Sequence, residues 1–439
     1  MAGRLLPNRF EDIIVSISLV RPGPLKSNMD KVYLPRRHGT EPVSYLHPRL
    51  KAALGETLGV ILYQEQVLKV AHDLAGMSYA EADGFRRAMT HDRTEEEMEK
   101  MRDSFLSACS KNGVSQKIAE KVFEQLAAFA AYGFCKAHAV AYAILAYQIL
   151  WLKRHYPAEF FAALLSNQPM GYYPPHVLVA DAERFGVKIL PLDVNRSFDR
   201  YTAEGDAISI SLSQLKGMSN EAVDSILSER EKGKYTSSRD FVLRTSVSQP
   251  IVENLVRVGA FDSLGARNEL LARLPQLINL KRKVLKGTSS LLDNGKLDQE
   301  LLGQTEDIDK KARMQVEREL LSLNLSAHPL DFCNIDNGLT RMKDLPAVPT
   351  GAMVKIAGSV IRYQTPPTRN GKRVVYVIME DGTGIADVTV FSDVQEKCGH
   401  VLFRASWLEV KGKVQRRGKK ALSIIADNLS PLVPESFLD

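Results

Sequence analysis

A glycine-centred turn at residues 215–223 has the residue types of a phosphate-binding site. The segment reads LKGMSNEAV, with Gly217 between two predicted short helices and Ser219 at the start of the second. Glycine lets a backbone approach a phosphate closely, and the free N–H groups of the next helix point toward it. This helix-hairpin-helix pattern predicts DNA binding that does not read sequence. The alternative is an ordinary packing turn in which Ser219 only caps the helix.

A second segment has the composition to complete a pair of hairpins. Residues 255–261 read LVRVGAF, with a glycine after a predicted helix. The candidate DNA contacts of the two hairpins are Lys216, Gly217, Ser219 and Gly259.

Basic residues crowd two predicted turns near the C-terminus, at residues 362–373 and 411–420, and neither turn contains an acid. Clustered cations of this kind bind the phosphates of a nucleic acid. Nearby aromatic residues at 363, 376, 391 and 407 either stack on bases or fill a protein core. We therefore predict single-stranded DNA binding. The candidate contacts are Arg362, Lys372, Lys411, Lys413, Arg416, Arg417, Lys419 and Lys420.

A third group of cations lies at the entry of an apolar helix. The segment YGFCKAH, residues 132–138, leads directly into AVAYAILAYQILWL, residues 139–152. Lys136 and His138 would add their charge to the helix dipole and so hold a polyphosphate. The alternative is that Lys136 extends to water and His138 makes an internal polar contact.

Three arginines are further candidates for a polyphosphate site. Arg21 begins an RPGP turn, and Arg86 and Arg87 follow Asp83 closely. Ion pairs of Asp83 with Arg86 and Arg87, at i, i+3 and i, i+4 spacing, explain the last two equally well. A basic loop is also expected at residues 35–39, PRRHG.

Length and composition indicate a folded protein of roughly three domains. The chain has 439 residues, 44% of them hydrophobic and 25% charged, and a net charge of +6. These values exclude disordered and collagen-like proteins. The four cysteines are far apart and lack metal-ligand spacing, which excludes a disulfide framework or a zinc finger and predicts a cytoplasmic location. No secretory signal is recognised, and residues 139–152 are too short to span a bilayer, so they predict a buried helix and no membrane partner.

The pattern of apolar residues predicts a multidomain α+β protein. Residues 10–165 are mostly helical, with Thr94 and Glu97 as a capping box. A helix at 175–185 and a strand at 187–190 precede short helices to residue 286, a polar linker and a charged helix at 307–325 that stops at residues 328–329. Five alternating runs then predict a five-stranded OB-fold β-barrel with a helix near 392–397. The strands are expected at 353–363, 373–379, 385–391, 407–414 and 422–425.

Several blocks of this sequence resemble the alpha subunit of bacterial DNA polymerase III, a C-family DNA polymerase. The tract at 167–187 and the segment at 362–372 are more similar to the error-prone, lesion-bypass paralogue than to the replicative subunit. The matching blocks, in family order, are RPGPLKSNMD (21–30), LGVILYQEQVLKVAHDLAGMSYAEADGFRRAM (58–89), YGFCKAHAVAYAILAYQILWLKRHYPAEFFAALLS (132–166), ILPLDVNRS (189–197) and ERELLSLNLSAHPL (317–330).

The resemblance implies a division into domains and a role for each. It implies fingers that meet the triphosphate of an incoming dNTP through Arg21, Arg86, Arg87, Lys136 and His138. It also implies duplex binding by the hairpins and template binding by the barrel. The expected domains are a fingers-like helical domain (1–170), a connector with a short strand (171–200), a tandem helix-hairpin-helix domain (201–286), a linker and charged helix (287–335) and an OB-fold domain (336–432).

The expected departure from this family concerns the catalytic metal. Nucleotidyl transfer uses clustered carboxylates to hold two Mg²⁺ ions, which the family keeps in a palm domain upstream of RPGP. The Asp307-Ile308-Asp309 segment is expected in a solvated helix, so we expect no catalytic carboxylates and no metal site in this chain, and Mg²⁺ only with a palm domain. Residues 287–293 lack the Gln and Phe of the family's clamp-binding peptide, so clamp binding is not expected.

Three hypotheses follow for the whole chain. The first is the C-terminal part of a polymerase, from a split subunit or a truncated gene, which binds primer–template DNA, single-stranded DNA and dNTP and works with a separate palm-bearing chain. The second is a stand-alone, non-catalytic DNA-binding protein. The third is that the start at Met1 is an artefact of gene assignment.

Overall fold

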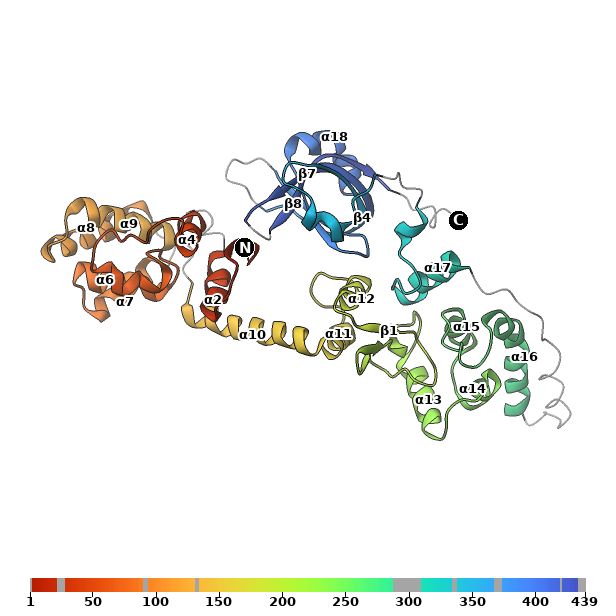
Figure 1. Ribbon diagram of the computed structural model, residues 1–439. Helices are drawn as coiled ribbons and strands as arrows, with labels where there is room; N and C mark the ends of the chain where they lie inside the picture. The colour runs from red at the N-terminus through yellow and green to blue at the C-terminus, as the bar shows by residue number, and fades with distance from the viewer. Residues whose placement is uncertain are drawn as a thin grey trace. The chain divides into compact units, whose positions relative to one another are not determined.

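The computed structural model describes residues 2–21, 28–89, 94–130, 134–286, 309–333, 338–366, 373–418 and 421–432 (Figure 1). The chain forms two compact units. Unit 1 is Met1–Trp151 with Arg416–Leu422, and unit 2 is Leu152–Gln415 with Ser423–Asp439.

Unit 1 is helical and has its own core. Apolar residues at three- and four-residue spacing place Val67, Val70 and Leu74 on one buried face of α6. Phe85 and Phe105 stack with ring centroids 5.5 Å apart. The helices are α1 (Ala2–Leu5), α2 (Phe10–Leu19), α4 (Met29–Arg37), α5 (Leu50–Leu54), the 3₁₀ turn η1 (Gly55–Thr57), α6 (Gln64–Ala75), α7 (Tyr79–Met89), α8 (Glu95–Lys111), α9 (Gln116–Ala130) and α10 (Lys136–His155).

Local signals define the start of α8 but not the end of α4. The capping box is confirmed, because the Glu97 amide donates to Thr94 Oγ1 (3.3 Å) and the Thr94 amide to Glu97 Oε2 (3.2 Å). The predicted loop at 35–39 is wrong in its first half, because α4 continues to Arg37. Tertiary contacts override the turn signal there: Arg37 donates to both carboxylate oxygens of buried Asp12, at 2.9 and 2.7 Å.

The prediction of a buried helix at 139–152 is wrong for most of its side chains. Ala139 and Ala143 are buried on one side of α10, whereas Leu150 is 59% exposed. A helix that is apolar on every side gives no periodic signal of which face is covered. Among the described residues, no helix has the length and apolarity needed to cross a membrane. The exposed apolar side chains of α10 in unit 1 are Tyr142, Ile144, Leu145, Tyr147, Ile149, Leu150 and Trp151.

Unit 2 begins with helices around a small sheet. The strand predicted at 187–190 is confirmed as β1, which pairs in parallel with β3, and β3 pairs antiparallel with β2. Strands β2 and β3 were not predicted, because three-residue strands carry too little alternation. The elements are α11 (Pro157–Ser166), α12 (Pro175–Arg184), β1 (Lys188–Leu190), β2 (Thr202–Glu204), β3 (Ala207–Ser209), the 3₁₀ turn η2 (Leu212–Gln214), α13 (Asn220–Glu231), α14 (Ser238–Arg244), α15 (Gln249–Arg257), α16 (Arg267–Leu285) and α17 (Lys310–Leu321).

The charged helix α17 ends before the predicted stop at residues 328–329. Ser322 follows it in the left-handed conformation (φ +56°), and the backbone of Leu325 and Ser326 donates to Glu317. These contacts turn the chain four residues before the predicted end of the helix at residue 325.

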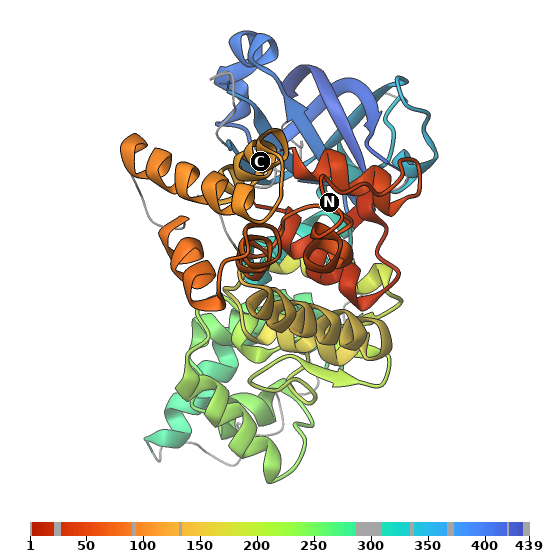
Figure 2. The ribbon, with the colours of Figure 1, turned by 90° about the vertical axis from the view of Figure 1, so that its left-hand side faces the viewer.

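The C-terminal residues form the predicted closed five-stranded barrel, drawn in blue in Figures 1 and 2. The strand order is β4-β5-β6-β8-β7, with β6 and β8 parallel. Gly412 permits tight closure, since a Cβ there would lie 2.2 Å from the Ile425 carbonyl oxygen. The multidomain α+β prediction is therefore confirmed. The elements are the 3₁₀ turns η4 (Pro329–Phe332) and η5 (Met342–Ala347), β4 (Met353–Gln364), β5 (Val375–Glu380), β6 (Ile385–Val390), α18 (Ser392–Leu402), β7 (Trp407–Arg416) and β8 (Leu422–Pro431).

Candidate nucleic-acid and nucleotide interface

The first hairpin has an open glycine at its turn. Gly217 has a φ of +85°, and a Cβ there would meet nothing within 4 Å, so a ligand has access to the turn. Ser219 caps α13 as the packing alternative expects, accepting from the Ala222 amide at 3.2 Å. The neighbouring Lys216 side chain is exposed, while its amide donates to the Leu320 carbonyl oxygen of α17 (2.8 Å).

An acidic side chain lies at the same helix end. The Glu221 carboxylate accepts from its own backbone N–H and from Ser219, and these bonds hold the pKa of Glu221 below its usual value. A phosphate bound to the first turn of α13 would compete with this carboxylate. The phosphate contact of the first hairpin therefore stays a prediction.

The second hairpin, between α15 and α16, uses its glycine for internal packing. Gly259 has a φ of +89°, and the Arg267 guanidinium lies where a Cβ would be. Arg267 donates to both oxygens of Asp262 (2.8 and 2.7 Å) and to the Arg257 carbonyl oxygen (3.2 Å). A side chain thus covers Gly259, whereas Gly217 is open.

Several of the predicted nucleotide contacts gather around Phe134 at the start of α10. The Arg21 guanidinium lies 3.8 Å from the centre of the Phe134 ring, and the His138 ring is 5.3 Å from it. The Phe134 carbonyl oxygen accepts from the Gln64 amide (2.9 Å), and the Gln64 side chain accepts from Arg86 (3.5 Å). The fold therefore brings together residues from α6, α7 and the start of α10.

Carboxylates accompany most of these cations. Lys136 Nζ is 2.5 Å from Glu56 Oε2, and the Lys136 amide donates to Glu65 at 3.1 Å. Sequence reasoning did not find these two acids, because they pair with a residue about seventy or eighty positions further along the chain. A polyphosphate at the start of α10 would have to replace them.

The predicted ion pairs of α7 are present. Arg86 and Arg87 each lie 2.9 Å from an oxygen of Asp83. The guanidinium groups of both arginines therefore already bind a carboxylate within the helix, which is what the ion-pair alternative predicts. The assignment of either arginine to a triphosphate stays a prediction.

The barrel presents part of its predicted basic surface outward. Lys411 and Lys413 are exposed on β7 and alternate with buried Val410, Gly412 and Val414. Arg416 ends that strand and Arg417 follows it. The predicted contacts Lys372, Lys419 and Lys420 lie outside the described residues.

The aromatic residues of the barrel divide between core and surface. Trp407 is buried at 8% exposure, Tyr363 and Tyr376 are half-buried, and Phe391 is exposed. Sequence reasoning missed exposed Phe403, whose ring lies 5.4 Å from that of Tyr363. It also missed a contact of Arg362 with Tyr172, whose ring centre is 3.4 Å from the guanidinium.

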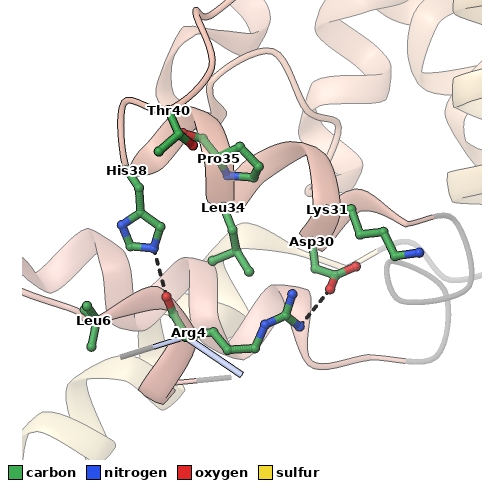
Figure 3. Close-up of a pocket in the computed structure, with 9 residues that line it drawn as sticks. Arg4, Leu6, Asp30, Lys31, Leu34, Pro35, His38 and Thr40 are labelled. Atoms are coloured by element: carbon green, nitrogen blue, oxygen red, sulfur yellow. Dashed lines mark hydrogen bonds and ion pairs between the residues drawn. The ribbon is translucent and has the colours of Figure 1, made fainter. Parts of the chain in front are cut away.

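A cavity of about 650 Å³ lies beside α4 in unit 1 (Figure 3). Arg4 pairs with Asp30 (2.9 Å), and the His38 ring contacts the Arg4 carbonyl oxygen (2.8 Å). Because these polar groups satisfy one another, the cavity indicates no particular ligand. The lining residues labelled in Figure 3 are Arg4, Leu6, Asp30, Lys31, Leu34, Pro35, His38 and Thr40.

The described residues do not fit a catalytic metal. Within them, no group of three or more His, Cys, Asp or Glu side chains is arranged to hold a metal ion. Asp307 lies outside the described residues, as does the candidate clamp segment 287–293. Asp309 caps α17, accepting from the Lys311 amide at 3.2 Å.

Three family models match successive parts of the chain. The bacterial DNA polymerase III alpha subunit finger domain matches residues 1–113, a helix-hairpin-helix motif matches 186–270, and an OB-fold nucleic-acid-binding domain matches 354–432. An error-prone DNA polymerase of Symbiobacterium thermophilum is 38% identical over 95% of this chain. The chain is a relative of the bacterial error-prone DNA polymerases. It is of the DNA polymerase III alpha type, as the resemblance indicated.

The chain spans about two-fifths of the length of the polymerases it matches. It covers 43% of the Symbiobacterium protein, and 39% of an error-prone DNA polymerase from Anaeromyxobacter dehalogenans that is 34% identical over the whole chain. Among solved structures, the mitochondrial single-stranded DNA-binding protein Rim1 from S. cerevisiae aligns with 19% of the chain and 97% of its own, at 15% identity and a TM-score of 0.17. A likeness at that level carries no argument about function.

Proposed function

We propose that this chain holds primer–template DNA and the triphosphate of an incoming nucleotide during DNA synthesis of the error-prone polymerase type. The observation that carries the proposal is the order of matched finger, hairpin and OB-fold segments along a chain that is 38% identical to an error-prone polymerase. The open turn at Gly217 and the exposed lysines of β7 support the DNA contacts. Both act on the DNA backbone, so binding is independent of sequence.

The start of α10 is the proposed triphosphate site. Arg21 stacks on Phe134 and pairs with no described carboxylate, so its hydrogen-bonding edge is available to a phosphate. Lys136 can exchange the Glu56 carboxylate for a phosphate oxygen, because that ion pair is two-fifths exposed and costs little to break. The positive end of the α10 dipole favours the same exchange.

The exposed apolar side chains of α10 support a partner in this activity. Soluble proteins leave large contiguous apolar patches where another protein surface covers them. We propose that the palm domain of the polymerase packs on these side chains and carries the carboxylates that hold magnesium. The palm belongs either to the same polypeptide or to a separate chain.

Primer extension tests the proposed role. The chain is mixed with the part of the Symbiobacterium polymerase that does not align with it, and extension of a labelled primer is followed. Extension is expected only with both components. Lys136→Ala is expected to raise the KM for dNTP about 10-fold or more, because a charge-assisted hydrogen bond is lost. Lys117→Ala, which removes an exposed charge from α9, is the control and should leave the KM for dNTP unchanged.

Two results would count against the proposal. One is DNA binding by the chain with no effect on extension. The other is an equal KM for dNTP in the Lys136→Ala and Lys117→Ala variants, which would remove the start of α10 as the triphosphate site.

A further inference from the structure

The contact between Tyr172 and Arg362 joins two parts of unit 2 that are far apart in the sequence. The Arg362 guanidinium lies 3.4 Å from the centre of the Tyr172 ring, which is cation–π geometry. Tyr172 is nevertheless 66% exposed. One face of the ring is therefore covered by the guanidinium, and the remainder is open to solvent.

The guanidinium of Arg362 can bind a further ligand besides the Tyr172 ring. No described carboxylate forms an ion pair with it, in contrast to Lys136, Arg86 and Arg87. A guanidinium that stacks through its face keeps its N–H groups at the edge, where they match the oxygens of a phosphate. A β-bulge between Val360 and Arg362 shifts the register of β4 against β5, and Arg362 pairs with Ile378 directly after it.

The loop that carries Tyr172, residues 167–174, is anchored to α11. The side chain of Asn167 donates to the Ala163 carbonyl oxygen (2.8 Å), and that of Gln168 donates to the Leu164 carbonyl oxygen (3.3 Å). The Met170 amide donates in turn to Gln168 Oε1 (3.2 Å). An aromatic ring on such a loop stacks on a base with little further loss of conformational freedom.

A buried carboxylate of the barrel lies close to the helix that follows this loop. Glu380 of β5 is 3% exposed, and His176, in the first turn of α12 after the loop, lies 3.8 Å from it. The same carboxylate accepts from Ser359 (2.5 Å) and from the Gly382 amide (2.8 Å), and the His328 ring lies 3.3 Å away. The start of α12 therefore approaches the barrel at a second point, besides the contact of Tyr172 with Arg362.

We propose that Tyr172 and Arg362 form a stacking site for one nucleotide of single-stranded DNA. The base stacks on the open part of the Tyr172 ring, and the adjacent phosphate binds the edge of the Arg362 guanidinium. Stacking on an aromatic ring accepts every base, so the site has no strong sequence preference. The inference rests on the proposed function, because it takes the barrel to bind a DNA strand, and it assigns part of that binding to the connector loop.

The test compares single-stranded with duplex oligonucleotides by fluorescence anisotropy. Tyr172→Ala is expected to weaken single-strand binding about 10-fold or more, whereas Tyr172→Phe keeps the ring and stays within about twofold of the native chain. Arg362→Lys keeps the charge but loses the planar edge. Its affinity for single-stranded DNA is therefore expected to lie between those of Tyr172→Ala and Tyr172→Phe. Met170→Ala, an exposed residue of the same loop, is the matched control. Duplex affinity is expected to stay unchanged in all four variants.

A 2-aminopurine base in the single strand gives a second readout. Stacking should quench its fluorescence in the native chain and in Tyr172→Phe, but not in Tyr172→Ala. Equal single-strand affinity and equal quenching in Tyr172→Ala and the native chain would overturn the inference and leave the proposed function in place. Failure of the native chain to bind either kind of DNA would overturn both.

Discussion

Replacing Lys411, Lys413, Arg416 and Arg417 together with alanine is expected to lower the affinity for single-stranded DNA by on the order of 10²- to 10³-fold at about 0.1 M salt. Each cation that neutralises a phosphate releases a counterion, and each contact to a single strand contributes about 0.7 to the slope of log affinity against log salt. Four lost contacts should therefore flatten that slope by about 3. Anisotropy titrations at several salt concentrations measure both quantities.

A second fourfold variant controls for net charge. Alanine at Lys100, Lys111, Lys117 and Lys121 removes four exposed positive charges from α8 and α9. Only a small general loss is expected from it, because these lysines are not assigned to DNA. If the two fourfold variants lost the same affinity with the same change of slope, the basic surface of β7 would have no special role.

Glu380→Ala is expected to lower the free energy of unfolding of unit 2 by about 3 kcal/mol at neutral pH. Burial by itself raises the pKa of Glu380, but the His328 ring, the Ser359 hydroxyl and the Gly382 amide outweigh it and lower this pKa from 4.5 to about 2. A shift of roughly 2.5 pH units corresponds to about 3 kcal/mol favouring the ionised, folded form. Urea unfolding followed by the fluorescence of Trp407, in a Trp151→Phe background, measures the loss. Glu396→Ala, which changes an exposed glutamate of α18, is the control.

The loss of unfolding free energy caused by Glu380→Ala should become smaller as the pH falls. Because the folded pKa is depressed, the stabilisation is complete above the unfolded pKa of about 4.5 and is lost as the pH falls toward 2. The difference between native chain and variant is therefore expected to shrink below about pH 4.5. A difference that stayed constant from pH 7 to pH 3 would show that the carboxylate charge does not provide the stabilisation.

The barrel and the capped helices could be predicted from the sequence because their signals are local. All five strands of the barrel lie close to the predicted runs, and Thr94 begins α8 as its spacing with Glu97 indicates. In both cases a period or a spacing within a few residues determines the structure. The end of α4 and the exposure of α10 depend on distant contacts, and local patterns could not predict them.

In the candidate sites, too, local features could be predicted from the sequence, whereas contacts between distant segments could not. The turn glycines Gly217 and Gly259 were found from sequence, but only the structure shows that one is open and the other covered by Arg267. The pairing of Lys136 with Glu56 and the stacking of Arg362 on Tyr172 each join residues from separate segments. Such pairs have no sequence period, and charge composition alone does not indicate whether a cation is already neutralised.

The most direct measurement of the central claim is the affinity of the 439-residue chain for a primer–template duplex as a function of salt concentration. We expect tight binding at low salt, a steep linear fall of log affinity with log salt, and the same slope for two unrelated DNA sequences. No binding at low salt, or an affinity that does not change with salt, would contradict the claim that this chain holds DNA through its backbone phosphates.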